Sequence, residues 1–260
     1  MPYANSNGAN IYWETSGSAD APPLLLLNSL GTTTGMWEDV AAELASDFLV
    51  IRTDTRGHGQ SQTSDGDYTI DLLAQDALAV LNAAGVEKAA VCGLSLGALV
   101  AVHLLKTSPE HVSALVLSNI AMAFNPPDWL QRAQAVRMSG MEAVVDASMP
   151  RFLTESFRTA EPARTNDIRD TLASNDPEGY AACCMAIANT PTLPTDLKGM
   201  DIPLLSIGGK QDAAAPPELA QQIAALVKGG VYCLLDAGHL SATEQPLGFS
   251  EAVRGFLAAR

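Results

Sequence analysis

A serine between two glycines is the residue of this sequence best placed to carry chemistry. Ser95 lies in Gly93-Leu94-Ser95-Leu96-Gly97, between the apolar run Ala89–Cys92 and a helical segment expected to begin at Ala98. A tight turn from strand to helix requires neighbours without bulk and leaves the hydroxyl at a helix N-terminus, where free N–H groups stabilise negative charge. The pattern predicts a nucleophile, and a Gly-rich turn with a surface serine is the alternative.

A serine hydroxyl needs a base, and the sequence has four histidines. His103 is expected inside a helix and His111 in a surface loop, whereas His58 and His239 each follow a strand-like run. Sites in open α/β sheets form at the carboxyl ends of strands, which favours the last two. The chain order of nucleophile, acid and base then selects His239.

The acid that fixes the histidine tautomer is predicted to be Asp212, in a turn-rich loop directly after a strand-like run. Asp236 is too close to His239 in the chain, and Asp201 precedes its strand. No carboxylate follows the strand that ends at Leu117. The sequence therefore predicts a triad of one serine, one aspartate and one histidine.

Two backbone N–H groups are predicted to hold the oxyanion of the tetrahedral intermediate. One is that of Leu96, directly after the serine. The other is that of Leu30, in the loop Asn28-Ser29-Leu30-Gly31-Thr32, where a glycine allows a tight turn. An ordinary strand-to-helix turn fits Gly31 equally well.

Strands and helices must alternate to position these residues. Asn7-Gly8 predicts an N-terminal hairpin. Buried parallel strands are predicted at Pro23–Leu27, Phe48–Ile51, Ala89–Cys92, Ala114–Leu117, Pro203–Ile207 and Val231–Leu235. Helices are predicted at Ile70–Ala84, Ala98–Thr107, Glu218–Val227 and Leu247–Ala259. This alternation predicts an α/β fold with a mostly parallel twisted sheet flanked by helices.

One segment breaks the alternation. Residues 121–197 show helical patterns punctuated by prolines and no convincing strand, which predicts a helical cap inserted between core strands. The core would then comprise residues 1–120 and 198–260. The cap holds six of the ten arginines, most of them expected to face water beside carboxylates.

Composition excludes several classes of function. The net charge of −14 argues against nucleic acid and anionic membrane surfaces as partners. No apolar run is long enough to span a membrane, and the N-terminus does not read as a signal peptide. The four cysteines lack metal-ligand spacing and are expected to be reduced and mostly buried, which favours the cytoplasm.

With these motifs in place, the chain resembles the α/β-hydrolases over its full length, and more narrowly the 3-oxoadipate enol-lactonases of the β-ketoadipate pathway in aromatic catabolism. The Asn-Ser-Leu-Gly form of the loop after the first parallel strand is fairly specific to that group. The other shared stretches are Arg52–Gly59, Gly93–Gly97, Tyr180–Cys184 and Asp236–His239.

The resemblance implies a reaction and a substrate. Ser95 would open an enol-lactone through an acyl-enzyme, giving 3-oxoadipate without a metal or organic cofactor. An anionic substrate needs a cationic partner, for which Arg132 and Arg151 in the cap are the candidates. Trp129 and Phe152 are the candidate apolar walls. The sequence does not indicate an oligomeric state.

The sequence departs from the pattern of these lactonases at positions expected to affect which substrate binds, and the three triad residues are unchanged. Arg151-Phe152-Leu153-Thr154 stands where those lactonases carry Arg-Trp-Phe-Thr, and Ile187–Thr190 replaces a charged stretch. Gly97-Ala98 also stands where the elbow normally continues Gly-Gly. A general carboxylesterase, a C–C bond hydrolase and a ligand receptor with vestigial turnover remain alternatives.

Overall fold

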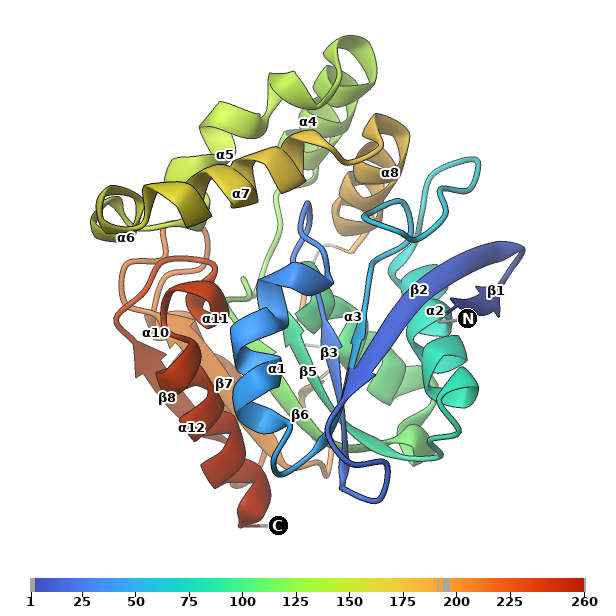
Figure 1. Ribbon diagram of the computed structural model, residues 1–260, viewed down its shortest axis with the longest axis vertical. Helices are drawn as coiled ribbons and strands as arrows, with labels where there is room; N and C mark the ends of the chain where they lie inside the picture. The colour runs from blue at the N-terminus through green and yellow to red at the C-terminus, as the bar shows by residue number, and fades with distance from the viewer. Residues whose placement is uncertain (1–2, 191, 194–196, 260) are drawn as a thin grey trace.

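The computed structural model describes residues 3–190, 192–193 and 197–259. An eight-stranded sheet forms its centre, in the order β1-β2-β4-β3-β5-β6-β7-β8 (Figure 1). The strands are β1 (Tyr3–Ser6), β2 (Ala9–Ser16), β3 (Pro23–Leu27), β4 (Leu49–Thr53), β5 (Ala89–Leu94), β6 (Val112–Ser118), β7 (Leu204–Gly209) and β8 (Val231–Leu235). From β4 to β8 the neighbours pair in parallel, and the predicted hairpin β1–β2 adds two antiparallel strands at one edge.

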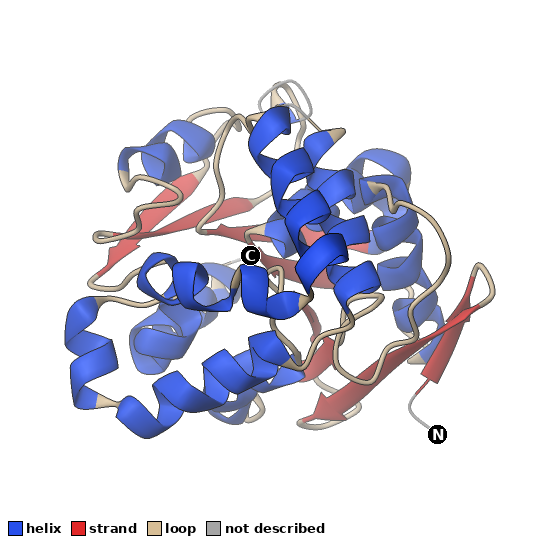
Figure 2. Cartoon of the chain, turned by 90° about the horizontal axis from the view of Figure 1, so that it is seen from above, coloured by secondary structure: helices blue, strands red, loops and turns tan. Residues whose placement is uncertain are grey.

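Helices cover both faces of this sheet (Figure 2). The core helices are η1 (Thr34–Trp37), α1 (Glu38–Leu44), α2 (Ile70–Ala83), α3 (Leu96–Thr107), η2 (Pro109–His111), α10 (Glu218–Ala224), α11 (Ser241–Glu244) and α12 (Pro246–Ala258). Helix α1 packs beside α12, and α2 packs beside α3. Among the described residues, no helix is long and apolar enough to cross a membrane. All four cysteines are free, and three of them are buried.

Burial along the strands follows from their position in the sheet. β5 and β7 lie in the interior and are buried at every residue, as their continuous apolar runs predict. The same prediction is wrong for β8, where Val231, Tyr232 and Leu234 are exposed. β8 is the edge strand, so its apolar residues are not covered on both faces.

The segment between β6 and β7 forms the predicted helical cap. Its helices are α4 (Pro126–Ser139), η3 (Met141–Ala143), α5 (Val145–Phe152), α6 (Glu155–Ala160), α7 (Pro162–Ala173) and α8 (Pro177–Ala188). Three of them start at proline. Proline suits the first helical position because the backbone N–H that it lacks would have no partner there. These helices lie above the carboxyl ends of the strands (Figure 1). The exact bounds 121–197 stay a prediction, and residues 191 and 194–196 lie outside the described part.

Helix α8 and the turn before it join the cap to the core. The Tyr68 N–H donates to Ala182 O at 3.3 Å, and the Asn175 side-chain amide donates to Gly31 O at 3.0 Å. The Thr63 hydroxyl donates to Asp176 Oδ2 at 2.7 Å. The cap is therefore attached on this side to two core loops, the one after β3 and the one between β4 and α2.

His58 is buried beneath this junction, beside the Tyr180 ring. Its Nδ1 lies 3.2 Å from Arg56 O, and its Nε2 has no hydrogen-bond partner in the described part of the chain. Burial lowers the pKa of His58 from 6.5 to about 4, although the Arg56 carbonyl and the charge of Asp176 oppose the shift.

The low pKa of His58 makes stability depend on pH. Above pH 6.5 the imidazole is neutral in both states, whereas between pH 6.5 and 4 the unfolded chain binds a proton that the folded protein excludes. The free energy of unfolding should therefore fall by about 3 kcal/mol between pH 7 and pH 4 through this residue. Urea unfolding of wild type and His58→Leu measures the difference, and equal slopes with pH in the two proteins would contradict it.

Candidate active site

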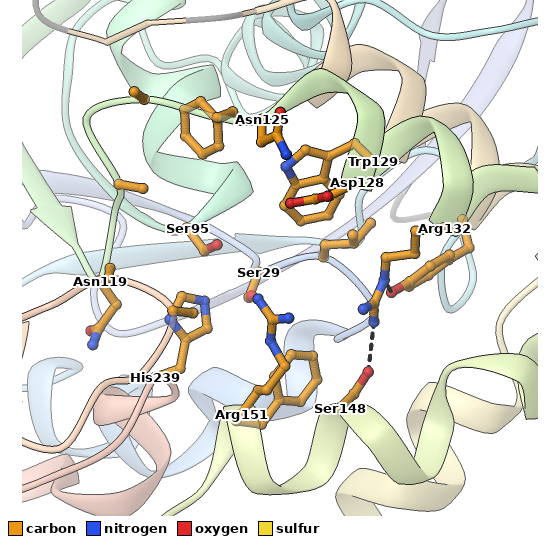
Figure 3. Close-up of a pocket in the computed structure, with 18 residues that line it drawn as sticks. Ser29, Ser95, Asn119, Asn125, Asp128, Trp129, Arg132, Ser148, Arg151 and His239 are labelled. Carbon is orange, nitrogen blue, oxygen red and sulfur yellow. Dashed lines mark hydrogen bonds between the residues drawn. The ribbon is translucent and has the colours of Figure 1, made fainter.

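The turn after β5 places Ser95 in a strained backbone conformation. Its φ of 55° and ψ of −110° lie where side chains other than glycine are rare. The turn is held because the Ser95 N–H donates to Ser118 O at 2.9 Å, at the end of the neighbouring strand. Helix α3 begins at Leu96 and not at the predicted Ala98, so the serine directly precedes the helix. The hydroxyl points into a cavity under the cap (Figure 3).

The two glycines of the turn are needed because backbone segments approach closely. A Cβ at Gly93 would collide with the Gly97 carbonyl, and one at Gly97 would collide with the Leu27 carbonyl at the end of β3. Neither glycine has a positive φ, so close packing and not backbone freedom requires them. The prediction that bulk is excluded beside the serine is confirmed.

Asp212 and His239 meet because β7 and β8 are neighbours in the sheet. The His239 Nδ1 lies 2.9 Å from Asp212 Oδ2, and both residues are buried. The two loops are joined by backbone hydrogen bonds from Lys210 to Leu235 at 2.8 Å and from Gln211 to Ala237 at 3.0 Å. The aspartate thus holds the Nδ1 edge of the imidazole, and His239 lines the same cavity as Ser95.

Every part of the Asp212 carboxylate is hydrogen-bonded. Oδ1 accepts from the N–H groups of Ala214 and Ala215 at 2.8 and 2.9 Å. Oδ2 accepts from His239 and from Asn119 Nδ2, the latter at 2.9 Å. Burial alone would raise the pKa of Asp212, but the hydrogen bonds and charge of His239, together with the amide of Asn119, hold it below its ordinary value. The group is therefore ionised at neutral pH.

Asn119 was not singled out by the sequence analysis. It directly follows β6 with a φ of 50°, and its side chain reaches the loops that follow β7 and β8. Its Nδ2 donates to Asp212 and also to Gly238 O at 3.1 Å. Its Oδ1 accepts from the hydroxyls of Ser118 and Ser241, each at 2.5 Å. Its position at the end of a strand is the one signal in the sequence, and an asparagine there is not a candidate for the acid of the triad.

The two predicted oxyanion donors are Leu96, directly after Ser95, and Leu30, which lines the same cavity as Ser95. Leu96 is the first residue of α3, so its N–H has no partner within the helix. Leu30 is buried in the turn after β3 and lines the cavity. Its N–H donates to no described residue. The geometry suits the predicted role, which remains a prediction.

The cavity between core and cap has a volume of about 220 Å³. It brings together Ser95 and His239 with all four cap residues predicted to bind substrate, which are Trp129, Arg132, Arg151 and Phe152. The Phe152 ring stacks on the His239 imidazole, with centroids 6.3 Å apart and planes at 21°. A cavity this small suits a metabolite better than a long acyl chain, since pockets for drug-sized ligands hold about 300–1,000 Å³.

The two candidate arginines differ in what already binds them. Arg132 Nε donates to Tyr180 Oη at 2.7 Å and Nη2 to Ser148 Oγ at 2.6 Å, which joins α4 to α8 and α5 (Figure 3). Arg151 makes no hydrogen bond or ion pair with any described residue and faces the cavity. Arg151 is therefore free to receive an anion, whereas Arg132 helps to hold the cap together.

The other cap arginines lie away from the cavity, and so do the core residues His103 and His111. Arg137, Arg164 and Arg169 pair with carboxylates near the surface. Such pairs were predicted for most of the six cap arginines, and the described residues show them for three. His103 contacts Asp71, and His111 contacts Glu87 O. Asp128 does line the cavity, beside Trp129 and across from Arg151, and was not predicted (Figure 3).

Comparisons with known proteins agree with this architecture. The family model described as alpha/beta hydrolase fold matches residues 22–246. The 3-oxoadipate enol-lactonase 2 of Acinetobacter baylyi is 34% identical over 248 residues, which span 95% of this chain and 92% of that protein.

Two solved structures extend the comparison. The enol-lactonase from Burkholderia xenovorans LB400 is 37% identical with a TM-score of 0.95, and the match covers 99% of this chain and all of that one. A thermophilic esterase from Thermogutta terrifontis, solved with malate bound, is 28% identical with a TM-score of 0.92, covering 100% and 97% of the two chains. The resemblance to the enol-lactonases is confirmed, and the chain belongs to the α/β-hydrolase fold family and is a hydrolase.

Proposed function

We propose that the chain is a serine hydrolase that opens a small anionic lactone or ester through an acyl-enzyme on Ser95. The substrate that we favour is 3-oxoadipate enol-lactone. The observation that carries the proposal is the shared cavity, in which Ser95 and His239 face a cationic wall formed by Arg151 and Arg132. Similarity to enol-lactonases supports the substrate.

The first half-reaction transfers the acyl group to the serine. The Ser95 hydroxyl attacks the lactone carbonyl while His239 Nε2 takes its proton, and Asp212 stabilises the imidazolium. The N–H groups of Leu30 and Leu96 donate to the oxyanion. When the intermediate collapses, the ring C–O bond breaks and the enol oxygen leaves with the proton held by His239, which becomes neutral again. The released enol then tautomerises to the ketone.

The second half-reaction releases the product. Water gives a proton to His239 and attacks the acyl carbon, the bond to Ser95 Oγ breaks, and the serine recovers its proton. The product is a dicarboxylate, so one carboxylate of the bound substrate must lie away from the reacting carbonyl. We assign Arg151 as the partner of this carboxylate. We place the reaction in the cytoplasm, which the four free cysteines support.

Substitution of Arg151 tests this assignment. Arg151→Gln should raise KM for the enol-lactone by roughly 10- to 100-fold, because a charge-assisted hydrogen bond is lost. KM for the neutral ester p-nitrophenyl acetate should stay within about twofold of wild type, since this ester has no carboxylate. Arg169→Gln is the matched control, because Arg169 is also a cap arginine but pairs with Asp146. Equal loss on both substrates would contradict a role for Arg151 in binding the anion.

A carboxylesterase acting on monoesters of small dicarboxylates is the second candidate. The similarity to an esterase solved with malate bound favours it, since malate is itself a small dicarboxylate. Ultraviolet measurement of enol-lactone consumption, compared with ester hydrolysis on the same preparation, decides between them. Ester turnover without lactone turnover would favour the esterase.

A further inference from the structure

Glu244 connects the cap to the loop that carries His239. It is the last residue of α11, five positions after the histidine. Its Oε1 accepts from the Gly238 N–H at 3.1 Å and from the Thr154 N–H at 2.9 Å, and its Oε2 accepts from the Thr154 hydroxyl at 2.7 Å. One carboxylate thus bridges the residue before His239 and Thr154, the N-cap residue of α6.

A second set of contacts joins the same two segments. The Leu240 N–H donates to Phe152 O at 2.9 Å, and the Phe152 ring stacks on His239. Cap residues 152–154 therefore contact Leu240 and the His239 ring directly and are linked to Gly238 through Glu244.

The two segments are packed without spare room. A Cβ at Gly238 would lie 2.9 Å from Glu244 Oε1 and 3.2 Å from both Phe152 O and Thr154 N. Because packed interfaces resist gradual deformation, a shift of this cap turn must also move the His239 loop. The base is thus held by Asp212 from the core side and by Glu244 and Phe152 from the cap side.

We propose that Glu244 is a positioning residue that locks the cap turn Phe152–Thr154 to the His239 loop, so that alignment of the base depends on the seating of the cap. Arg151 directly precedes this turn, so an anion bound there acts on the same turn that orients the histidine. The proposal rests on the function proposed above, in which His239 is the base and Arg151 binds the substrate carboxylate.

Kinetics of Glu244 variants supply the first test. Glu244→Ala should lower kcat for p-nitrophenyl acetate by roughly 10- to 100-fold with KM within about twofold, because the base is misplaced while this ester has no carboxylate to be bound by Arg151. Glu244→Gln should stay within about threefold of wild type, since its carbonyl can accept both N–H groups and its amide can donate to the Thr154 hydroxyl. Glu251→Ala, on the exposed side of α12, is the control.

A spectroscopic readout separates alignment from stability. The proton shared by His239 Nδ1 and Asp212 should give a far-downfield proton NMR signal, and Glu244→Ala should shift or broaden it while leaving the protein folded by circular dichroism. A lower melting temperature with unchanged kcat and an unchanged signal would overturn the proposal and leave Glu244 a purely structural residue. If wild type showed no turnover of lactone or ester, the proposed function would fail, but the NMR signal would still test the link.

Combining Thr154→Val with Glu244→Ala tests whether the two residues act together. Thr154→Val removes one donor to Glu244 but keeps the backbone N–H. If the bridge acts as a unit, Thr154→Val should lower kcat in the wild-type background and have little further effect in the Glu244→Ala background. Additive losses would show that the two residues act separately and would overturn the bridging role.

Discussion

Ser95→Ala is expected to lower kcat for hydrolysis by roughly 10⁴-fold or more, since no acyl-enzyme can form without the hydroxyl. The strained turn needs no particular side chain at position 95, so the variant should fold normally. Stopped-flow assays with p-nitrophenyl acetate should also lose the burst that reports acylation. Retention of more than about one tenth of the wild-type rate would disprove the nucleophile assignment.

Ser108→Ala is the matched control for this substitution, because Ser108 caps the opposite end of the same helix. Binding of 3-oxoadipate to Ser95→Ala, measured by calorimetry, addresses the receptor alternative. Intact binding together with clear wild-type turnover supports an enzyme. Intact binding with negligible wild-type turnover would instead favour a receptor.

The positions of Ser95, Asp212 and His239 could be predicted because each follows an apolar run that forms a parallel strand. Parallel strands β5, β7 and β8 have their carboxyl ends on the same side of the sheet. The position of each residue after its strand is therefore enough to predict that the three lie close together. The family resemblance then supplied the cap arginines, but it could not say which of them is free.

Asn119 and Glu244 could not be found in this way because their roles depend on which strands and loops are neighbours. Asn119 matters because β6 lies between β5 and β7, which places its amide beside Asp212. Glu244 matters because the cap turn returns to the His239 loop. The exposure of β8 has the same origin, since an apolar run does not say whether its strand is central or at the edge.

Asp212→Asn is expected to lower kcat by roughly 10⁴-fold while changing almost nothing in shape. Two backbone N–H groups, from Ala214 and Ala215, already point at the Oδ1 position, so the new amide must place its oxygen there. Its NH₂ group then faces His239 Nδ1, which has to accept a hydrogen bond. That forces the tautomer with a proton on Nε2, and such a ring cannot take the proton of Ser95.

The same substitution should also destabilise the fold, because the new NH₂ group faces the NH₂ group of Asn119. The orientation of Asn119 is fixed, since its Nδ2 donates to Gly238 O, which can only accept. Adding Asn119→Asp removes the clash between the two NH₂ groups but places a carboxylate oxygen beside Gly238 O, which can only accept, so the melting temperature should not recover.

The double variant separates two explanations of what Asp212 does. If Asp212 acts by fixing the tautomer of His239, Asp212→Asn with Asn119→Asp should not regain turnover, because Nδ1 still faces an amide donor. If a nearby negative charge were sufficient, the carboxylate introduced at position 119 would restore a large part of kcat. Melting curves and kcat for p-nitrophenyl acetate on the two single variants and the double variant measure both effects, and recovery of activity would contradict the tautomer argument.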